Sequence, residues 1–68
     1  MSIAKVIEVI AEGRTIEEAM QSALKEASKT ITNIRQIDID HIHAKVENGK
    51  IIKYRVDARV SFLVRQAA

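Results

Sequence analysis

Cysteine and tryptophan are absent from this chain of 68 residues, which also has a single Phe and a single Tyr. Without cysteine there is no disulfide framework, thiolate zinc site, iron–sulfur cluster or cysteine nucleophile. No apolar run reaches the length of a membrane span. The first residues lack the long apolar region and the small-residue cleavage site of a signal peptide. We therefore expect neither a membrane partner nor a secretion signal.

The charge balance argues against nucleic acid as a partner. Lys and Arg number 11 and Asp and Glu number 9, so the net charge is only +2. A single-strand binder needs exposed aromatic side chains beside a basic groove. The two aromatic residues, Tyr54 and Phe62, instead fall on the apolar face of a predicted strand.

The chain is short for an independently stable domain. Below about 70–80 residues, a single core rarely buries enough apolar surface. Ile and Val nevertheless make up 17 of the 68 residues, which is more aliphatic surface than one small core can hide. We expect a homo-oligomer; the alternative is a marginal monomer with an Ile-rich core.

The first half of the chain predicts a strand followed by a helix. Residues 3–11 are β-branched and apolar on both faces, as in a strand that is buried on both sides. Gly13 should end the strand, because glycine permits backbone angles closed to other residues. Thr15 and Glu18 form a capping box, in which we expect Glu18 to reach back to the Thr15 amide. The helix should run from Ile16 to about Thr30.

The second half predicts a hairpin. Asn48-Gly49 fits the two positive-φ positions of a type I′ turn, and residues 51–65 show a long and regular alternation of apolar and polar side chains. A straight register from this turn predicts the cross-strand pairs Glu47–Lys50, Val46–Ile51, His43–Tyr54 and Ile39–Ala58.

The strand before the turn changes phase near Asp40-His41. Either a β-bulge lies there, or the second half of the strand faces a different neighbour. The whole chain, residues 1–68, is thus predicted to be a single α+β domain of order β-α-β-β. Its three-stranded antiparallel sheet has the last strand in the middle and one helix on one face.

No constellation of catalytic residues is visible, so we expect no enzymatic activity. The cluster Asp38–His43 is the one candidate metal site. On a regular strand, His41 and His43 would point to one face, and Asp38 and Asp40 to the other. Each pair supplies two ligands, so symmetry copies would have to complete a calcium, zinc or similar site. The alternative is a polar face that is solvated or paired with Arg and Lys.

The chain resembles the dodecin family along almost its whole length. The matching segments are Lys5-Val6-Ile7-Glu8-Val9, Glu17-Glu18-Ala19, Ala27-Ser28-Lys29-Thr30, Tyr54-Arg55-Val56 and Val60-Ser61-Phe62. The resemblance implies a strongly curved sheet that half-wraps the helix, and a hollow dodecamer built from trimers. It also implies a cytoplasmic protein that stores or buffers flavin and is not an enzyme.

The flavin-pocket positions implied by the resemblance are Gln36, Asp38, His41 and Arg55. Flavin-binding dodecins carry a stacking Trp where this chain has Gln36, and a ring-bonding Gln where it has Arg55. His41 corresponds to an acidic or polar group near the ribityl chain. The chain is more similar to family members that lack the Trp and are described as calcium binders.

We therefore expect a dodecin-like shell that buffers small ligands or ions and binds FMN or riboflavin weakly. Its partners are copies of itself and a small molecule or ion such as calcium. The alternatives are a flavin-storage dodecin with an unusual pocket, and a structural or partner-binding module without a ligand.

Overall fold

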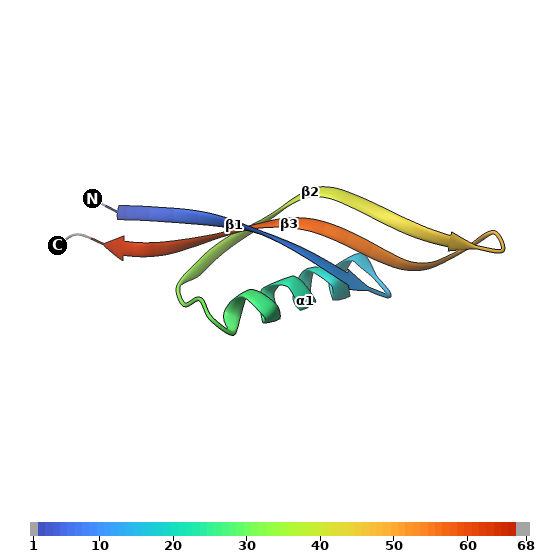
Figure 1. Cartoon of the computed structure of the whole chain (residues 1–68), viewed down its shortest axis with the longest axis horizontal. Helices are drawn as coiled ribbons and strands as arrows, with labels where there is room; N and C mark the ends of the chain where they lie inside the picture. The colour runs from blue at the N-terminus through green and yellow to red at the C-terminus, as the bar shows by residue number, and fades with distance from the viewer. Residues whose placement is uncertain (1, 67–68) are drawn as a thin grey trace.

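A computed structural model describes residues 2–66, which form a three-stranded sheet and one helix (Figure 1). The elements are, in order, β1 (Ser2–Gly13), α1 (Ile16–Ser28), β2 (Ile34–Glu47) and β3 (Lys50–Gln66). The strand order is β1-β3-β2, and both neighbours run antiparallel to β3. The predicted fold is thereby confirmed.

The core lies between α1 and the middle of β3 and is built from small side chains. Among the residues that the structure describes, six are buried: Ala19, Ala23, Ala27, Val56, Ala58 and Val60. The three alanines recur every four residues and so form one stripe along the helix. Because they carry only methyl groups, the helix lies close to the sheet.

The helix begins at a cap that differs slightly from the prediction. Thr15 Oγ1 accepts the Glu18 amide hydrogen at 3.0 Å, as expected. The Glu18 carboxylate, however, accepts from the Arg14 amide at 3.3 Å, one residue before the predicted Thr15. The helix ends at Ser28, with Lys29 as the C-cap, rather than at Thr30.

Gly13 is needed for space and not for an unusual backbone angle, which corrects the predicted reason. Its φ is not positive, unlike that of Gly49. A Cβ atom at position 13 would lie 2.5 Å from the Ala19 amide nitrogen and 2.9 Å from the Glu18 carbonyl carbon. The end of β1 thus touches the backbone of the first helical turn.

The hairpin has the predicted turn but not a straight register. Asn48 and Gly49 have φ values of 51° and 74°, as a type I′ turn requires. Glu47 pairs with Lys50, and Val46 with Ile51. Ile52 is then an extra residue in β3, because the next pair is Lys45 with Lys53.

This bulge makes the predicted pairing of His43 with Tyr54 wrong: His43 lies opposite Arg55. A second extra residue, Asp40 in β2, restores the predicted pairing of Ile39 with Ala58. The phase change near Asp40 is therefore a β-bulge, the first of the two explanations that the sequence left open.

The single chain is long and thin. Its extents are 56 × 20 × 13 Å. Its radius of gyration is 14.3 Å, against about 11 Å for a compact domain of this length. Its accessible surface is 5199 Å², whereas size scaling gives about 4,300 Å². The hairpin projects beyond the helix as a two-stranded arm (Figure 1).

Apolar side chains stay exposed along this shape. Large hydrophobic residues with more than a third of their surface exposed are Ile3, Val6, Ile10, Ile16, Ile42, Val46, Ile51, Ile52 and Val64. Within residues 2–66, no helix has the length and apolar character needed to cross a bilayer.

Candidate functional site

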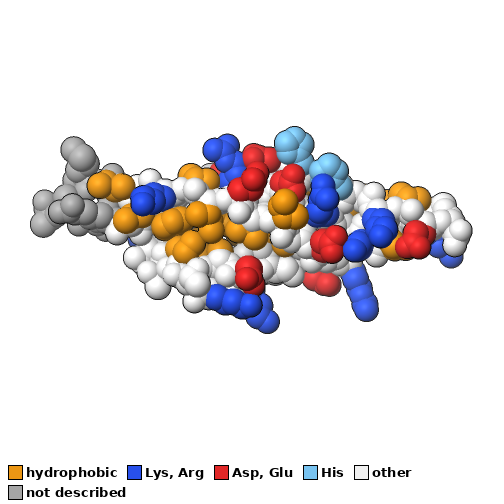
Figure 2. All heavy atoms as spheres, viewed as in Figure 1, with side chains coloured by type: hydrophobic (Ala, Val, Ile, Leu, Met, Phe, Trp, Pro, Cys, Tyr) orange, Lys and Arg blue, Asp and Glu red, His pale blue; other side chains and the backbone are white. Residues whose placement is uncertain are grey.

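One face of the sheet is covered by α1, and the other, here called the outer face, is largely polar. Directly paired residues of antiparallel strands lie on the same face. Three cross-strand rows of the outer face are Glu8–Arg59–Asp38, Ile10–Asp57–His41 and Glu12–Arg55–His43. Figure 2 shows both imidazoles on the side away from the helix, with acidic and basic side chains beside them; other charged side chains lie on the helix side. The outer face therefore brings imidazoles, carboxylates and cations close together.

The Asp40 bulge determines which side chains share the outer face. Before the bulge, Ile39 lies opposite Ala58, whose side chain is buried under the helix. After the bulge, His41 lies opposite Asp57 on the outer face. An extra residue shifts the alternation of side chains by one position. Two consecutive residues, Asp40 and His41, therefore point outward.

As a result, the two carboxylates and the two imidazoles of the cluster lie on the same face. Asp38 is opposite Arg59, and His43 follows His41 at a spacing of two. The Asp40 Oδ2 atom is 3.8 Å from the Arg59 Nε atom. The predicted placement on opposite faces is wrong, because it assumed a strand without a bulge.

Gln36 is tied to its neighbour on β2. Its side-chain amide nitrogen donates to both carboxylate oxygens of Asp38, at 2.9 and 3.0 Å. Both residues lie on the outer face, since Gln36 pairs with Ser61. The Gln36 amide is therefore engaged by a carboxylate of its own strand.

Asp57 lies in the middle row of the outer face, and its carboxylate is only partly engaged in ion pairs. Its side chain is 20% exposed, and its Oδ1 atom is buried without a hydrogen-bond partner among the described residues. The His41 Nδ1 atom is 3.9 Å from Oδ2, and the Arg55 Nε atom is 4.0 Å from Oδ1. These distances allow electrostatic attraction but exceed hydrogen-bond length. Asp57 therefore interacts with His41 and Arg55 through electrostatic attraction alone.

The two histidine rings lie side by side on the outer face. The ring centroids of His41 and His43 are 6.3 Å apart, and the ring planes make an angle of 28°. His41 is well exposed, so its edge is open to solvent.

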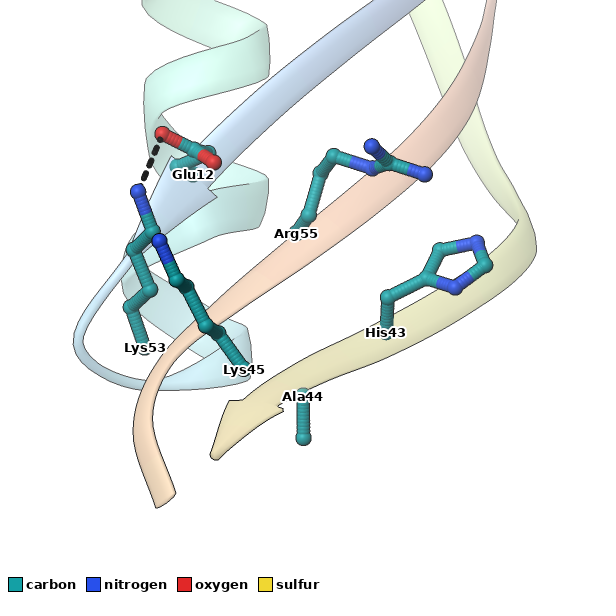
Figure 3. A pocket seen from close by; sticks show the side chains of 6 residues that line it. All are labelled: Glu12, His43, Ala44, Lys45, Lys53 and Arg55. Atoms are coloured by element: carbon teal, nitrogen blue, oxygen red, sulfur yellow. Dashed lines mark hydrogen bonds and ion pairs between the residues drawn. The ribbon is translucent and has the colours of Figure 1, made fainter. Parts of the chain in front are cut away.

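A groove of about 380 Å³ opens where β1 ends beside the hairpin arm. We call it the basic groove; it is lined by Glu12, His43, Ala44, Lys45, Lys53 and Arg55. Figure 3 shows the Lys45 and Lys53 side chains pointing in the same direction beside Glu12, while the Arg55 guanidinium and the His43 ring lie on the other side and extend away from the lysines. The Lys53 Nζ atom is 3.2 Å from the Glu12 Oε1 atom. Cationic groups therefore dominate the groove.

The predicted flavin-pocket residues do not meet within one subunit. Gln36 pairs with Ser61, whereas Arg55 lies six residues earlier on the same strand. At about 3.3 Å per residue, these positions are about 20 Å apart. His41 lies one row from Arg55, and Asp38 lies beside Gln36. Gln36 and Arg55 therefore lie at opposite ends of this set within one subunit.

The predicted metal ligands also fall short of a complete site in one chain. Within the part of the chain that the structure describes, no group of three or more His, Asp or Glu side chains is arranged to hold a metal ion. The predicted ligands Asp38, Asp40, His41 and His43 thus form no such group within the described residues.

Comparison with known proteins agrees with this fold. The dodecin family model matches residues 3–65. A protein from Thermus thermophilus is 22% identical and has a TM-score of 0.89, with 98% of this chain and 100% of that chain covered. The dodecin from Streptomyces davaonensis is 17% identical and has a TM-score of 0.85, with 96% and 97% covered. No curated protein matches the chain.

This chain belongs to the dodecin family, because the family model covers nearly its entire length. The solved structures share its fold. The family and the fold support a small, oligomeric, ligand-binding protein.

Sequence reasoning missed the basic groove. It identified Arg55 and His43, but it did not connect them with Lys45, Lys53 or Glu12. A straight hairpin register places Lys45 opposite Ile52, whereas the bulge places it opposite Lys53. The Asn-Gly turn was a usable signal, but the bulge beside it was not visible.

Proposed function

We propose that this protein forms a hollow homo-oligomeric shell, a dodecamer, that buffers or sequesters small ligands or ions in the cytoplasm without acting as an enzyme. Family membership supports storage rather than catalysis. The elongated subunit, with its excess of exposed apolar surface, supports assembly. In this proposal, the shell does not bind flavin tightly.

The observation that supports weak flavin binding is the identity of residue 36, Gln36, and its hydrogen bonds. The family resemblance places a flavin-stacking Trp at this position, and the chain contains no Trp. Aromatic stacking contributes about 0.5–1.5 kcal/mol beyond the burial of area. The Gln36 amide is also bonded to Asp38 at 2.9 and 3.0 Å. A flavin ring would find neither a stacking face nor a free amide there.

Arg55 changes the other end of the implied pocket. It replaces a neutral glutamine with a permanent cation and lies 4.0 Å from the carboxylate of Asp57. A neutral side chain that would hydrogen-bond the flavin ring is thereby replaced by a charged one. This change supports a ligand class other than flavin.

Flavin titration tests this proposal. Free riboflavin and FMN should keep most of their fluorescence at submicromolar protein, because the chain has no Trp that could stack on the ring and quench it. The Gln36→Trp variant should quench both and bind at least several-fold more tightly, consistent with the stacking contribution. Wild-type protein that quenches flavin at nanomolar concentration would establish the alternative, a flavin-storage dodecin with an unusual pocket.

A divalent ion is a second candidate, favoured by the Asp40 bulge. The bulge turns both carboxylates and both imidazoles of the cluster toward one face. Oxygen ligands favour calcium. We expect calcium to raise the melting temperature of the assembled oligomer, and Asp38→Asn with Asp40→Asn to abolish that rise. Absence of any effect of calcium on the assembled wild-type protein would leave the cluster as an arginine-paired surface.

A further inference from the structure

The basic groove holds more positive charge than its own carboxylate can balance. Lys45, Lys53 and Arg55 line it together with the single carboxylate of Glu12. Glu12 pairs with Lys53 at 3.2 Å. Asp57 lies behind Arg55, at 4.0 Å from its Nε atom. With Asp57 included, three permanent cations face two carboxylates, and without it they face one.

The two lysines are placed against electrostatic preference. Lys45 lies directly opposite Lys53 on neighbouring strands, and like charges in such a pair destabilise a sheet. Lys53 is compensated by Glu12, but Lys45 forms no ion pair with any residue within 2–66. The Ile52 bulge creates this pairing. An anion between the two ammonium groups would turn this repulsion into attraction.

We propose that the basic groove binds the phosphate group of a small phosphorylated molecule. A phosphate monoester carries a charge of about −1.5 to −2 at neutral pH, which balances the excess of one to two positive charges. Arg55 supplies a planar fork that suits phosphate oxygens, and the lysines supply point charges. His43, opposite Arg55, adds a ring that can donate to an oxygen.

The size and surroundings of the groove favour a small molecule over a nucleic acid. Its volume of about 380 Å³ is near the lower end of the range of about 300–1,000 Å³ for ligand sites. On either side of the groove the cations are interspersed with carboxylates, since Lys50 pairs with Glu47 on the turn side and Asp57 separates Arg55 from Arg59 on the other. A nucleic-acid backbone needs a longer basic track. The groove matches one phosphate group and the body attached to it.

This inference rests on the proposed function, because it names the class of ligand that the shell would store. The groove itself is formed within one subunit, so binding and assembly can be measured separately. Native mass spectrometry gives the oligomeric state. Loss of assembly with retained phosphate binding would count against the shell alone, and an intact shell without phosphate binding would count against the groove alone.

The experiment is calorimetric titration of the full chain with ribose 5-phosphate, ribose and inorganic phosphate, in phosphate-free buffer at low salt. We expect ribose 5-phosphate to bind and ribose to give no heat. Lys45→Gln should weaken binding about tenfold, the effect of losing one charge-assisted contact. This variant breaks no ion pair with the described residues, so its folding should be unchanged. Arg55→Gln should weaken binding at least as much.

Lys50→Gln is the matched control, because Lys50 belongs to the same hairpin but does not line the groove. It should bind ribose 5-phosphate as the wild type does. Inorganic phosphate that binds as well as ribose 5-phosphate would also support the site and identify free phosphate as sufficient. Added salt should weaken binding, because the groove is open to solvent.

Three results would overturn the proposal. The first is no heat with either phosphate-bearing ligand. The second is an equal loss of binding in Lys45→Gln and in the Lys50→Gln control. The third is tighter binding of a short single-stranded oligonucleotide than of ribose 5-phosphate, which would assign the groove to nucleic acid.

Discussion

Gly13 and Gly49 are the two glycines of the chain, and they are required for different physical reasons. Gly49 has a φ of 74°, and nothing lies within 4 Å of the place where a Cβ would stand. Gly13 has an ordinary backbone angle, but a Cβ there would lie 2.5 Å from the Ala19 amide nitrogen. Glycine is therefore required at position 49 because of the backbone angle, and at position 13 because there is no space for a side chain.

Substitutions at the two glycines should separate these effects. We expect Gly13→Ala to lower the free energy of unfolding by about 1–3 kcal/mol, because the helix must move away from the strand. Gly49→Ala should cost about 1–2 kcal/mol from the left-handed angle. Asn tolerates that angle, so Gly49→Asn should be milder than Gly49→Ala, while Gly13→Asn should be worse than Gly13→Ala. Denaturant unfolding measures the free energy of unfolding of all four variants. If the Ala variant were the more stable one at both sites, or the Asn variant at both sites, this account would be contradicted.

The helix element depends on its stripe of methyl groups. Ala19, Ala23 and Ala27 are buried against β3, where Val56 and Val60 are fully covered. A larger side chain at the centre of this stripe would have to push the helix and sheet apart. The spacing of four between these alanines is visible in the sequence, because the repeat of an amphipathic helix lies within a single short segment.

We predict that Ala23→Leu destabilises the fold, whereas Gln21→Leu on the exposed side of the same helix does not. Overpacking of this kind costs about 1–3 kcal/mol, which lowers the melting temperature by roughly 4–8 °C per kcal/mol in a domain of this size. Both variants introduce leucine, so the helix propensity of the new residue is the same at the two sites. Thermal melts that place Ala23→Leu within a degree or so of Gln21→Leu would show that the helix does not lie closely against the sheet.

The two strands of the hairpin show where sequence reasoning stops. The alternation in residues 51–65 and the Asn-Gly turn predicted β3 and the first two cross-strand pairs correctly. The bulges at Ile52 and Asp40 could not be placed in the same way. A bulge is a property of two paired strands, whereas an alternating pattern describes only one.

The errors about the candidate site follow from those two bulges. One of them placed Asp38 and Asp40 on the same face as the histidines, and the other placed Lys45 opposite Lys53. The phase change near Asp40 was visible in the sequence, and it marked the right position. The Ile52 bulge left no such mark, since Ile51 and Ile52 are both apolar.

At the scale of the whole molecule, the hairpin arm exposes apolar side chains. Val46 and Ile51 form a cross-strand pair there, and they are 58% and 55% exposed. The arm extends past the end of β1, where Gly13 pairs with Tyr54. An isolated two-stranded hairpin is marginal in water. An ordered arm with this apolar pair is consistent with a surface that another subunit covers in the proposed shell.

We predict that Val46→Thr with Ile51→Thr shifts the assembly toward smaller species at micromolar concentration. Threonine keeps the β-branched shape and so the strand preference, but it removes apolar area worth about 1–2 kcal/mol at each position when buried. Native mass spectrometry measures the species, and circular dichroism checks that the fold remains. Glu47→Thr with Lys50→Thr, at the next pair of the same hairpin, is the matched control and should assemble as the wild type does. If the Val46 and Ile51 variant also assembles as the wild type does, the arm is not part of a subunit interface, and its exposed apolar pair must have another role.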